Sequence, residues 1–435
     1  MNPRLITAES RLRQKIPTSP ISPFRLLLIF FSLASSAAGL AATAPYPWPV
    51  EPQFLTLTLE RIASLPAAEQ PAWRAYLNAS QAVAAILPKR EAFVTPSVQK
   101  LEGPGIPGKH SRGLQLFAAK DWYAGEVARA VADRVVAAQT KAGGWTKGND
   151  YTKAVAEKTV GADVWSGGTL DNDATTWELR FLALAAAATA DAARAASWRE
   201  SFGRGLRYVL ASQYPNGGFP QIYPLAGGYH DAITFNDDAT VQALELLRDL
   251  ADGKPEFAFV SADLRSQAGP SVARGLRCLL DTQLRAADGR RTVWCQQHDA
   301  LTLKACAARN FEPVAACTNE SAALVKFLMT VPNPSPEVRA AVQGAIAWFN
   351  RTTLRDLAWT RQGGTGQLVA RPGAPPLWAR MYELGTDRPI FGDRDRTVHF
   401  AVAELSSERR AGYAWYGAWP ASALAAFATW PGKNQ

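Results

Sequence analysis

The chain has 435 residues, 47% of them hydrophobic, and a formal net charge of +9. This is enough apolar sequence for a large core, so folding does not depend on disulfides or structural metals. Lys and Arg form no tract interleaved with aromatic residues, which argues against a nucleic-acid partner. The modest positive charge suits an anionic partner without identifying one.

The beginning of the chain has the pattern of a secretory signal. Five basic residues lie among the first 25, an apolar run covers Leu26–Phe31, and small residues follow from Ala37 to Ala44. The run is too short for a membrane span, which needs about 20 apolar residues. We therefore expect residues 1–41 to be a cleaved signal peptide and the mature protein to be exported, either periplasmic or secreted, with no membrane span.

Helical patterns dominate the rest of the chain. Residues 42–112 are expected to form an N-terminal linker and the first helices, and residues 113–430 the catalytic domain. Within that domain, Phe181–Ala196 is rich in Ala and Leu, and Val241–Leu250 has apolar residues at helical spacing, so both predict helices. No run of alternating strands is present, which favours an all-α fold.

An internal repeat organises this helical region. A helical segment ends in Gln139, Gln213 and Gln283, and a turn rich in Gly and aromatic residues follows each time; the glutamines are 74 and 70 residues apart. In phase with these turns, polar N-cap segments precede a second helix in each repeat, at residues 169–175, 235–240 and 318–322. Three helical hairpins in a toroid would gather these helix starts at one mouth, which suits an anionic ligand.

Acidic residues in the cap segments are the first candidates for chemistry. Each of Asp171, Asp173, Asp237 and Asp238 is most simply a helix cap. Because the segments repeat, however, we expect Asp171 and Asp237 to face each other across the mouth. Two such carboxylates with waters suit Ca²⁺, and they would equally suit the acid and base of a glycosidase.

Arginines in later loops are the second set of candidates. Arg309 lies between the third repeat's turn and its cap. Arg380 and Arg394 lie among aromatic and turn residues, a setting that suits carboxylate binding as well as ordinary ion pairs. The aromatic segment Tyr413–Pro420 is either a sugar-stacking platform or part of the core.

The chain resembles the family-ten pectate lyases at these residues. The resemblance runs in order over roughly residues 120–425 and is carried by residues 143–145, 169–172, 216–221, 233–239, 308–309, 378–383, 387–391, 394–395 and 412–417. It implies an (α/α)₃ toroid with long loops that form a cleft at one mouth. It also implies calcium-assisted cleavage of polygalacturonate, or pectate, by anti β-elimination. We also expect the protein to be a monomer.

The resemblance also implies roles for particular residues. Arg309 corresponds to the catalytic base, and Asp171 and Asp237 to metal ligands. The substrate-binding residues implied are Asn172, Arg380 and Arg394. A guanidinium is normally protonated, so the role of base requires neighbouring cations that disfavour its charge.

Other functions remain open on the residues alone. An inverting glycoside hydrolase on a helical barrel would use the same carboxylates. Gly205–Leu210 followed by Gln213 is similar to the repeat of terpene cyclase and prenyltransferase toroids. A non-catalytic uronate-binding protein is a further alternative.

The four cysteines, at positions 278, 295, 306 and 317, form an even set in an expected oxidising compartment, so one or two disulfides are predicted. Four cysteines allow three pairings, and the sequence does not choose among them. Our working hypothesis is a Cys306–Cys317 bridge, because these residues flank Arg309. A Cys278–Cys295 bridge is an equally simple pair.

Overall fold

The computed structural model describes residues 46–47, 55–87, 113–152 and 167–434. The chain divides into two units, residues 1–42 and 43–435, and the first unit lies outside the described residues. The predicted signal peptide, most of the Pro-rich linker and the loop 88–112 therefore lie outside the description as well. Of the helices that are described, none is long and apolar enough to cross a membrane.

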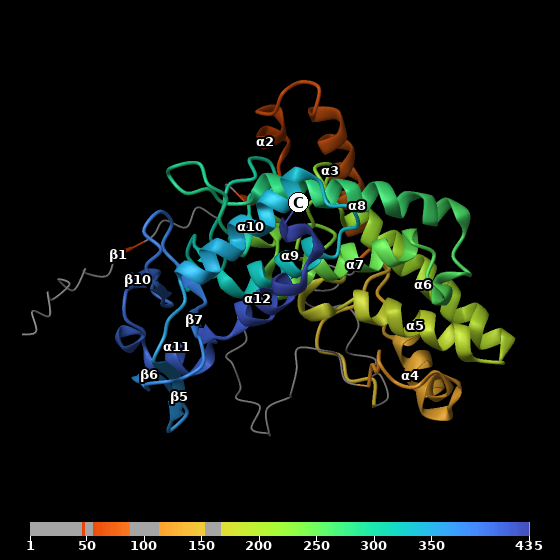
Figure 1. The fold of residues 1–435 in the computed structure, drawn as a ribbon. Coiled ribbons are helices and arrows are strands. Elements are labelled where there is room, and N and C mark those ends of the chain that lie inside the picture. Colours follow the sequence, from red (N-terminus) through yellow and green to blue (C-terminus); the bar gives the residue numbers. More distant parts are fainter. Residues whose placement is uncertain (1–45, 48–54, 88–112, 153–166, 435) are drawn as a thin grey trace, which may run out of the picture. The chain divides into compact units, whose positions relative to one another are not determined.

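About half of the described chain is helical (Figure 1). The α-helices are α2 (Leu59–Ala63), α3 (Gln70–Ala85), α4 (Glu126–Ala137), α5 (Thr176–Ala188), α6 (Ala192–Ser212), α7 (Ala239–Ala251), α8 (Ala262–Thr282), α9 (Thr318–Met329), α10 (Pro336–Arg351), α11 (Ser407–Gly412) and α12 (Trp419–Thr429). The strands are β1 (Tyr46–Pro47), β2 (Ile233–Thr234), β3 (Gln297–His298), β4 (Ala316–Cys317), β5 (Leu357–Gln362), β6 (Thr365–Ala370), β7 (Trp378–Ala379), β8 (Met381–Tyr382), β9 (Phe391–Gly392), β10 (Thr397–His399) and β11 (Tyr416–Gly417).

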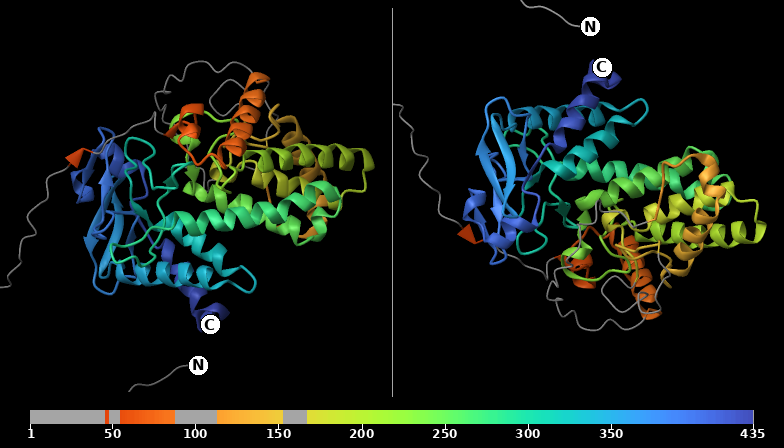
Figure 2. Two further views of the ribbon diagram at one scale, coloured as in Figure 1. Left: turned by 90° about the horizontal axis from the view of Figure 1, so that it is seen from above. Right: turned by 90° about the horizontal axis from the view of Figure 1, so that it is seen from below.

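The helices pack as three consecutive hairpins, α5–α6, α7–α8 and α9–α10. Neighbouring hairpins touch along two rows, α5–α7–α9 and α6–α8–α10, while α4 packs on α5 and α12 packs on α9. Figure 2 shows the hairpins in succession from α5 to α10, with the strands of the C-terminal third beside them. The predicted all-α, (α/α)₃ class is confirmed.

Helix boundaries follow from local capping. Asp191 accepts a hydrogen bond from the N–H of Arg194 and starts α6, and Ser261 and Ser335 cap α8 and α10 in the same way. The single helix predicted over Phe181–Ala196 is wrong, because the chain turns extended at Thr189 and restarts after the Asp191 cap. The helix predicted over Val241–Leu250 is confirmed as α7.

The repeated glutamines follow α4, α6 and α8 and join these helices to α6, α8 and α10 respectively; we call them the glutamine latches. Each side-chain amide donates one hydrogen bond into the turn that follows it and a second to a backbone carbonyl in α6, α8 or α10. The bonds run from Gln139 to Gly143 (2.7 Å) and Ser201 (2.9 Å), from Gln213 to Gly217 (3.0 Å) and Ser271 (2.9 Å), and from Gln283 to Thr292 (2.8 Å) and Ala341 (2.8 Å). The internal repeat is therefore a structural device.

Glycine allows the turn after the second latch to approach its neighbouring helix. Gly217 has φ +92°, and a Cβ at this position would lie 2.1 Å from the carbonyl oxygen of Arg274 in α8. No other residue type meets both conditions without strain.

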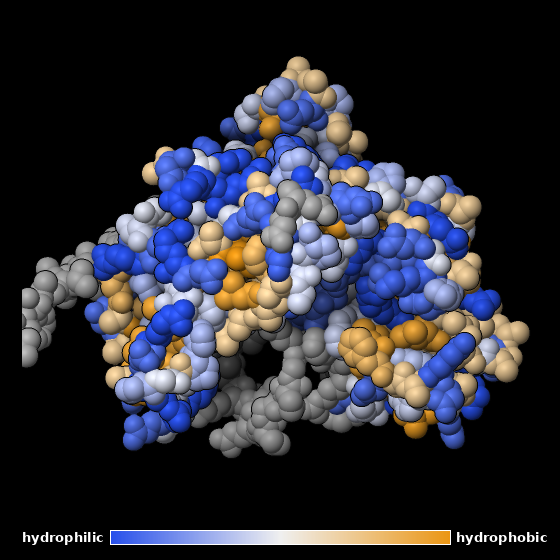
Figure 3. Space-filling model, in the orientation of Figure 1, coloured by the Kyte–Doolittle hydropathy of each residue, from blue (hydrophilic) through white to orange (hydrophobic). Residues whose placement is uncertain are grey.

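A β-hairpin in the C-terminal third was not predicted. Strands β5 and β6 pair in register from Leu357↔Ala370 to Gln362↔Thr365. The two-residue turn between them is Gly363–Gly364 with φ +56° and +80°, which suits the primed turns that hairpins favour. The remaining strands have two or three residues each. On the face seen in Figure 3 the surface is mostly polar, with apolar side chains gathered near α12.

Candidate active site

The starts of three helices lie together at one end of the hairpins. Each of the first two follows a short 3₁₀ helix, η3 (Asp171–Asp173) before α5 and η5 (Asn236–Asp238) before α7. These 3₁₀ helices contact each other, and α9 contacts η5. The predicted gathering of helix N-termini is thus confirmed, and the predicted acidic residues line it.

The register of the repeat differs by one residue from the expected one. Thr175 and Thr240 each bond the carbonyl six residues earlier, at 2.8 and 2.7 Å, so these two threonines are equivalent. Positive φ values fall at Asn172 (53°) and Asp237 (50°), and again at the residue after each. Asp237 therefore corresponds to Asn172, and Asp171 corresponds to Asn236. The assumption that Asp171 and Asp237 are equivalent was wrong, although both lie at the mouth.

Asp171 is buried and held from one side only. Its Oδ2 accepts a hydrogen bond of 2.5 Å from Nζ of Lys147, while its buried Oδ1 has no hydrogen-bond partner among the described residues. Burial raises the pKa of Asp171, Lys147 opposes this, and the negative charge of Asp237 raises the pKa further. The two aspartates are therefore close enough to repel each other.

Asp237 and Asn172 are half-buried beside this carboxylate. Oδ2 of Asp237 accepts a hydrogen bond of 2.8 Å from the amide of Asn236. The buried Oδ1 of Asn236 has no partner within the described ranges. The mouth thus holds two unsatisfied oxygen atoms, one each from η3 and η5, next to a second carboxylate.

Arg309 is fixed by Glu312, three residues further along the same loop. Its Nε donates to Oε2 of Glu312 over 2.7 Å, its Nη2 donates to Oε1, and its backbone N–H donates to Oε2 over 3.1 Å. The Arg309 side chain remains 45% exposed, whereas Glu312 is only 2% exposed. Burial disfavours the Arg309 charge, but the hydrogen bonds and charge of Glu312 outweigh it and raise the Arg309 pKa.

Arg380 is deeply buried. Its side chain is 8% exposed, forms an ion pair with Glu320 of α9, and stacks with the guanidinium carbon 4.9 Å from the Tyr413 ring centre. Asp237 and Glu312 also favour its charge. One oxygen of Glu320, Oε2, is buried without a hydrogen-bond partner in the described chain.

Arg394 lies at the surface. Its side chain is 54% exposed and bonds both oxygens of Glu408 at 3.1 Å. Its guanidinium and that of Arg309 both stack on the buried ring of Phe311, at 5.1 and 4.8 Å from the ring centre. Phe311 thus brings the predicted base and one predicted substrate-binding arginine into one neighbourhood.

The structure brings the six predicted site residues into this region and adds others that sequence reasoning missed. Lys147 follows the first Gly/aromatic turn, and nothing in its local sequence pointed to Asp171. Tyr229 interacts electrostatically with Arg309 and Asp171, and burial raises its pKa to about 12. From the sequence, Tyr413 could belong either to a sugar-stacking platform or to the core. In the structure its hydroxyl donates a hydrogen bond of 3.0 Å to Glu312. Its neighbour Trp415 is fully buried in the core.

The four cysteines are unpaired in the structure, and all are buried. The hypothetical Cys306–Cys317 bridge and its Cys278–Cys295 alternative are therefore both wrong for this structure. The thiol of Cys295 donates a hydrogen bond of 3.5 Å to the carbonyl oxygen of Cys306, and that of Cys317 donates one of 3.5 Å to Ala315. The loop that carries Arg309 is held by Glu312 and Phe311 instead of a disulfide.

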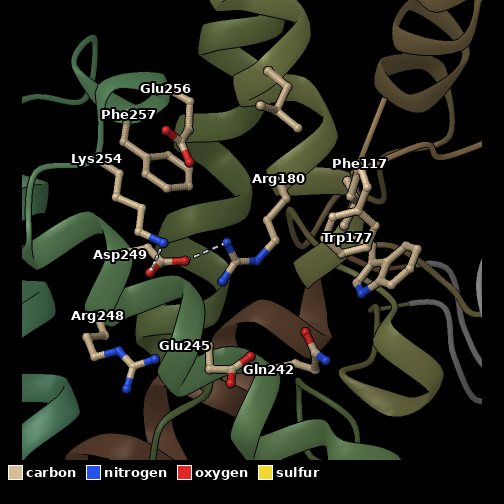
Figure 4. Close-up of a pocket in the computed structure, with 12 residues that line it drawn as sticks. Phe117, Trp177, Arg180, Gln242, Glu245, Arg248, Asp249, Lys254, Glu256 and Phe257 are labelled. Atoms are coloured by element: carbon tan, nitrogen blue, oxygen red, sulfur yellow. Dashed lines mark hydrogen bonds and ion pairs between the residues drawn. The ribbon is translucent and has the colours of Figure 1, made fainter. Parts of the chain in front are cut away.

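A cavity of about 430 Å³ lies between α5 and α7 (Figure 4), and none of the predicted site residues lines it. Asp249 takes part in ion pairs with Arg180 and Lys254, each at 2.7 Å, within its wall. Because its lining contains none of the residues gathered at the helix starts, this cavity is not the candidate site.

Comparisons with known proteins agree with this geometry. A family model described as pectic acid lyase matches residues 139–424, more than half of the chain. The chain belongs to the pectic acid lyase family. The matched residues include all six predicted site residues of this pectate lyase. A comparison with curated proteins found no match.

Two solved structures are similar to the lyase. One is a mutant of a family 10 polysaccharide lyase from Cellvibrio cellulosa in complex with trigalacturonic acid, with 32% identity and a TM-score of 0.63; the match covers 73% of this chain and 98% of that one. The other is the family 10 polysaccharide lyase from Cellvibrio cellulosa, with 32% identity, a TM-score of 0.63 and coverage of 74% and 97%. These findings decide against the glycosidase, the terpene cyclase and the non-catalytic alternative.

Proposed function

We propose that this lyase cleaves polygalacturonate by calcium-assisted anti β-elimination, with Arg309 as the base. The observation that carries the proposal is the half-exposed guanidinium of Arg309, held beside the Asp171–Asp237 pair at the mouth. The trigalacturonic acid bound by the Cellvibrio enzyme supports a uronate substrate. Elimination removes the C5 proton, which lies α to the C6 carboxylate, and breaks the bond from C4 to the glycosidic oxygen. A C4–C5 double bond forms, and the leaving oxygen takes up a proton to become a hydroxyl group.

Calcium fits the donor chemistry of the mouth. Asp171 offers a buried oxygen without a hydrogen-bond partner among the described residues, and Asp237 adds a second carboxylate. Within the described ranges no three His, Cys, Asp or Glu residues are grouped to hold a metal ion. Waters and substrate oxygens would therefore complete the six to eight ligands that Ca²⁺ takes. When bound, Ca²⁺ neutralises a uronate carboxylate and stabilises the negative charge that develops on proton removal.

The protein residues would divide the remaining work. Arg309 would take the C5 proton at its exposed guanidinium. Arg380 and Arg394 supply positive charge for uronate carboxylates, and Arg394 is the more accessible of the two. Asn172, half-buried within η3, would hydrogen-bond the sugar. Glu312 favours the charged form of Arg309, so bound Ca²⁺, Arg380 and Arg394 would have to supply the positive charge that disfavours it.

Export is part of the proposal and rests on residues 1–41 alone. Sequencing the N-terminus of the protein recovered from the periplasm or medium tests it. A start near Ala41 or Ala44 supports export, and an intact Met1 on active protein contradicts it.

The deciding experiment measures ultraviolet absorbance during a polygalacturonate digest, with and without EDTA. An unsaturated uronide absorbs through its conjugated double bond, so absorbance should rise and should stop rising after chelation. New reducing ends without absorbance would show hydrolysis. Undiminished activity after exhaustive chelation would remove calcium from the mechanism.

A further inference from the structure

Glu312 occupies an unusual position for a carboxylate in a loop. Its side chain is only 2% exposed, and it forms an ion pair with Arg309. Burial alone would raise the pKa of Glu312, but the hydrogen bonds and charge of Arg309 outweigh it and hold that pKa below the usual range. A buried ionised carboxylate needs its partner in place at all times.

Three of the four hydrogen bonds to the Glu312 carboxylate come from Arg309. Two guanidinium nitrogens, Nε and Nη2, and the Arg309 backbone N–H are used by the same carboxylate. The hydroxyl of Tyr413 donates to Oε1 over 3.0 Å and fixes the carboxylate in turn. The ring of Phe311 supports the guanidinium at 4.8 Å.

This arrangement leaves one nitrogen for chemistry. Nη1 of Arg309 makes no hydrogen bond to any described residue, and 45% of the side chain is exposed to solvent. A planar fork held at two nitrogens has no rotational freedom, so the third nitrogen points in a single direction.

We propose that Glu312 is a positioning residue of the active site, which holds the guanidinium of Arg309 at Nε and Nη2 and leaves Nη1 for the substrate. The inference rests on the proposed function of Arg309 as the base. Tyr413 contributes indirectly, because its hydroxyl donates a hydrogen bond that holds the carboxylate of Glu312 in place. The groups that act electrostatically on Arg309 are Glu312, Tyr413, Tyr229 and Asp171, and Glu312 is the one that bonds it directly.

The test compares Glu312→Gln and Tyr413→Phe with the wild type, and uses Glu337→Gln as a control. Glu337 is a 57% exposed carboxylate on α10 that is paired with Arg277 at 3.4 Å. Steady-state kinetics on polygalacturonate are measured across pH, with thermal unfolding as the check on folding. A misaligned reacting group costs up to about 100-fold in rate. We therefore expect Glu312→Gln to lower kcat by about 10- to 100-fold at little change in KM, and the control to match the wild type.

The pH profile separates this role from simple structural support. Removing the negative charge of Glu312 lowers the Arg309 pKa, so the rising limb of kcat should move to lower pH in Glu312→Gln. Tyr413→Phe keeps the charge, so its limb should stay in place while kcat falls several-fold. A folded Glu312→Gln variant with wild-type kcat, or with an unshifted limb, overturns the inference. If Glu312→Gln does not fold, unchanged kcat in Tyr413→Phe overturns it. Failure of the proposed function is separate, because the wild type would then give no ultraviolet product.

Discussion

Lys147 bonds Oδ2 of Asp171 over 2.5 Å and leaves the buried Oδ1 of the same carboxylate without a partner among the described residues. An ammonium and a metal ion therefore compete for one side chain. The Lys147 side chain is 35% exposed, so its hold on Asp171 is that of a partly solvated ion pair.

Replacing Lys147 by Met should tighten calcium binding. The competing charge is lost, and a partly exposed ion pair is worth up to about 1 kcal/mol, so the Kd should fall by about two- to fivefold. Calorimetric titration with calcium measures this. The exposed Lys141, on the preceding turn, provides the control variant Lys141→Met. Weaker binding in Lys147→Met would show that Lys147 assists the metal instead of competing with it.

The metal-free protein should lose stability as pH rises. Burial and the charge of Asp237 raise the Asp171 pKa above that of the unfolded chain, so the folded state binds more protons in the range between the two values. The free energy of unfolding therefore falls as pH rises through that range. Asp171→Asn should flatten this fall, and urea unfolding in EDTA from pH 4 to 7 measures it. Calcium at 100 times its Kd should restore about 2.7 kcal/mol to the wild type only.

Arg309 and Arg394 should fail in different ways. Loss of a general base costs about 10²- to 10⁴-fold in rate, so Arg309→Ala and Arg309→Lys should lower kcat by this factor with oligogalacturonate affinity retained. Arg394→Ala should chiefly weaken binding, measured by calorimetry. Near-normal kcat in Arg309→Ala would refute the assignment, and the exposed Lys304 in the same loop would be the next candidate.

Arg380→Ala should destabilise the fold as well as weaken binding. The substitution leaves the fully buried Glu320 without its ion-pair partner. Breaking a buried ion pair lowers the free energy of unfolding by about 3–5 kcal/mol. The exposed Arg394–Glu408 pair contributes at most about 1 kcal/mol, so Arg394→Ala serves as the matched control in urea unfolding. Equal stability of the two variants would contradict the burial of Arg380.

Thiol counting tests the cysteines. All four are buried and unpaired, so none should react with a thiol reagent in the native protein and all four should react after unfolding without reductant. Burial raises the pKa of the Cys278 thiol to about 12, which further suppresses its reactivity. Two reactive thiols after unfolding would reveal a disulfide, and peptide mapping would identify the pair.

The helical repeat was readable from the sequence because it depends on local signals. Gln213 and Gly217 are a helix end and a turn, and both types of signal act within a few residues. The grouping of Asp171, Asp237 and Arg309 was also predicted, since equivalent segments of a repeat lie at equivalent ends. The one-residue register difference was missed, although the matching Asp-Ala-Thr segments at 173–175 and 238–240 indicate it; the hydrogen bonds of Thr175 and Thr240 and the positive φ values confirm it.

What the sequence could not show is which charges meet in space. Arg380 and Glu320 are 60 residues apart, and Lys147 and Asp171 lie on different sides of a segment outside the described residues. The sequence predicted the same substrate-binding role for Arg380 and Arg394. The structure distinguishes them, because Arg380 is buried against Glu320 and Arg394 is exposed to solvent. The β5–β6 hairpin was missed because its two glycines were not taken as a turn.

Because of the glutamine latches, the positions of the helices do not depend on the loops that follow the latched turns. Each latch bonds to a helix residue 62, 58 or 58 positions further along the chain, a nearly constant interval. Two helices are therefore held together before the chain enters the loops of the mouth. Insertions beyond the latched turn therefore change the walls of the cleft and leave the helix ends in place. A scaffold of this kind permits new substrate preferences to be engineered by exchanging loops between family members, one repeat at a time.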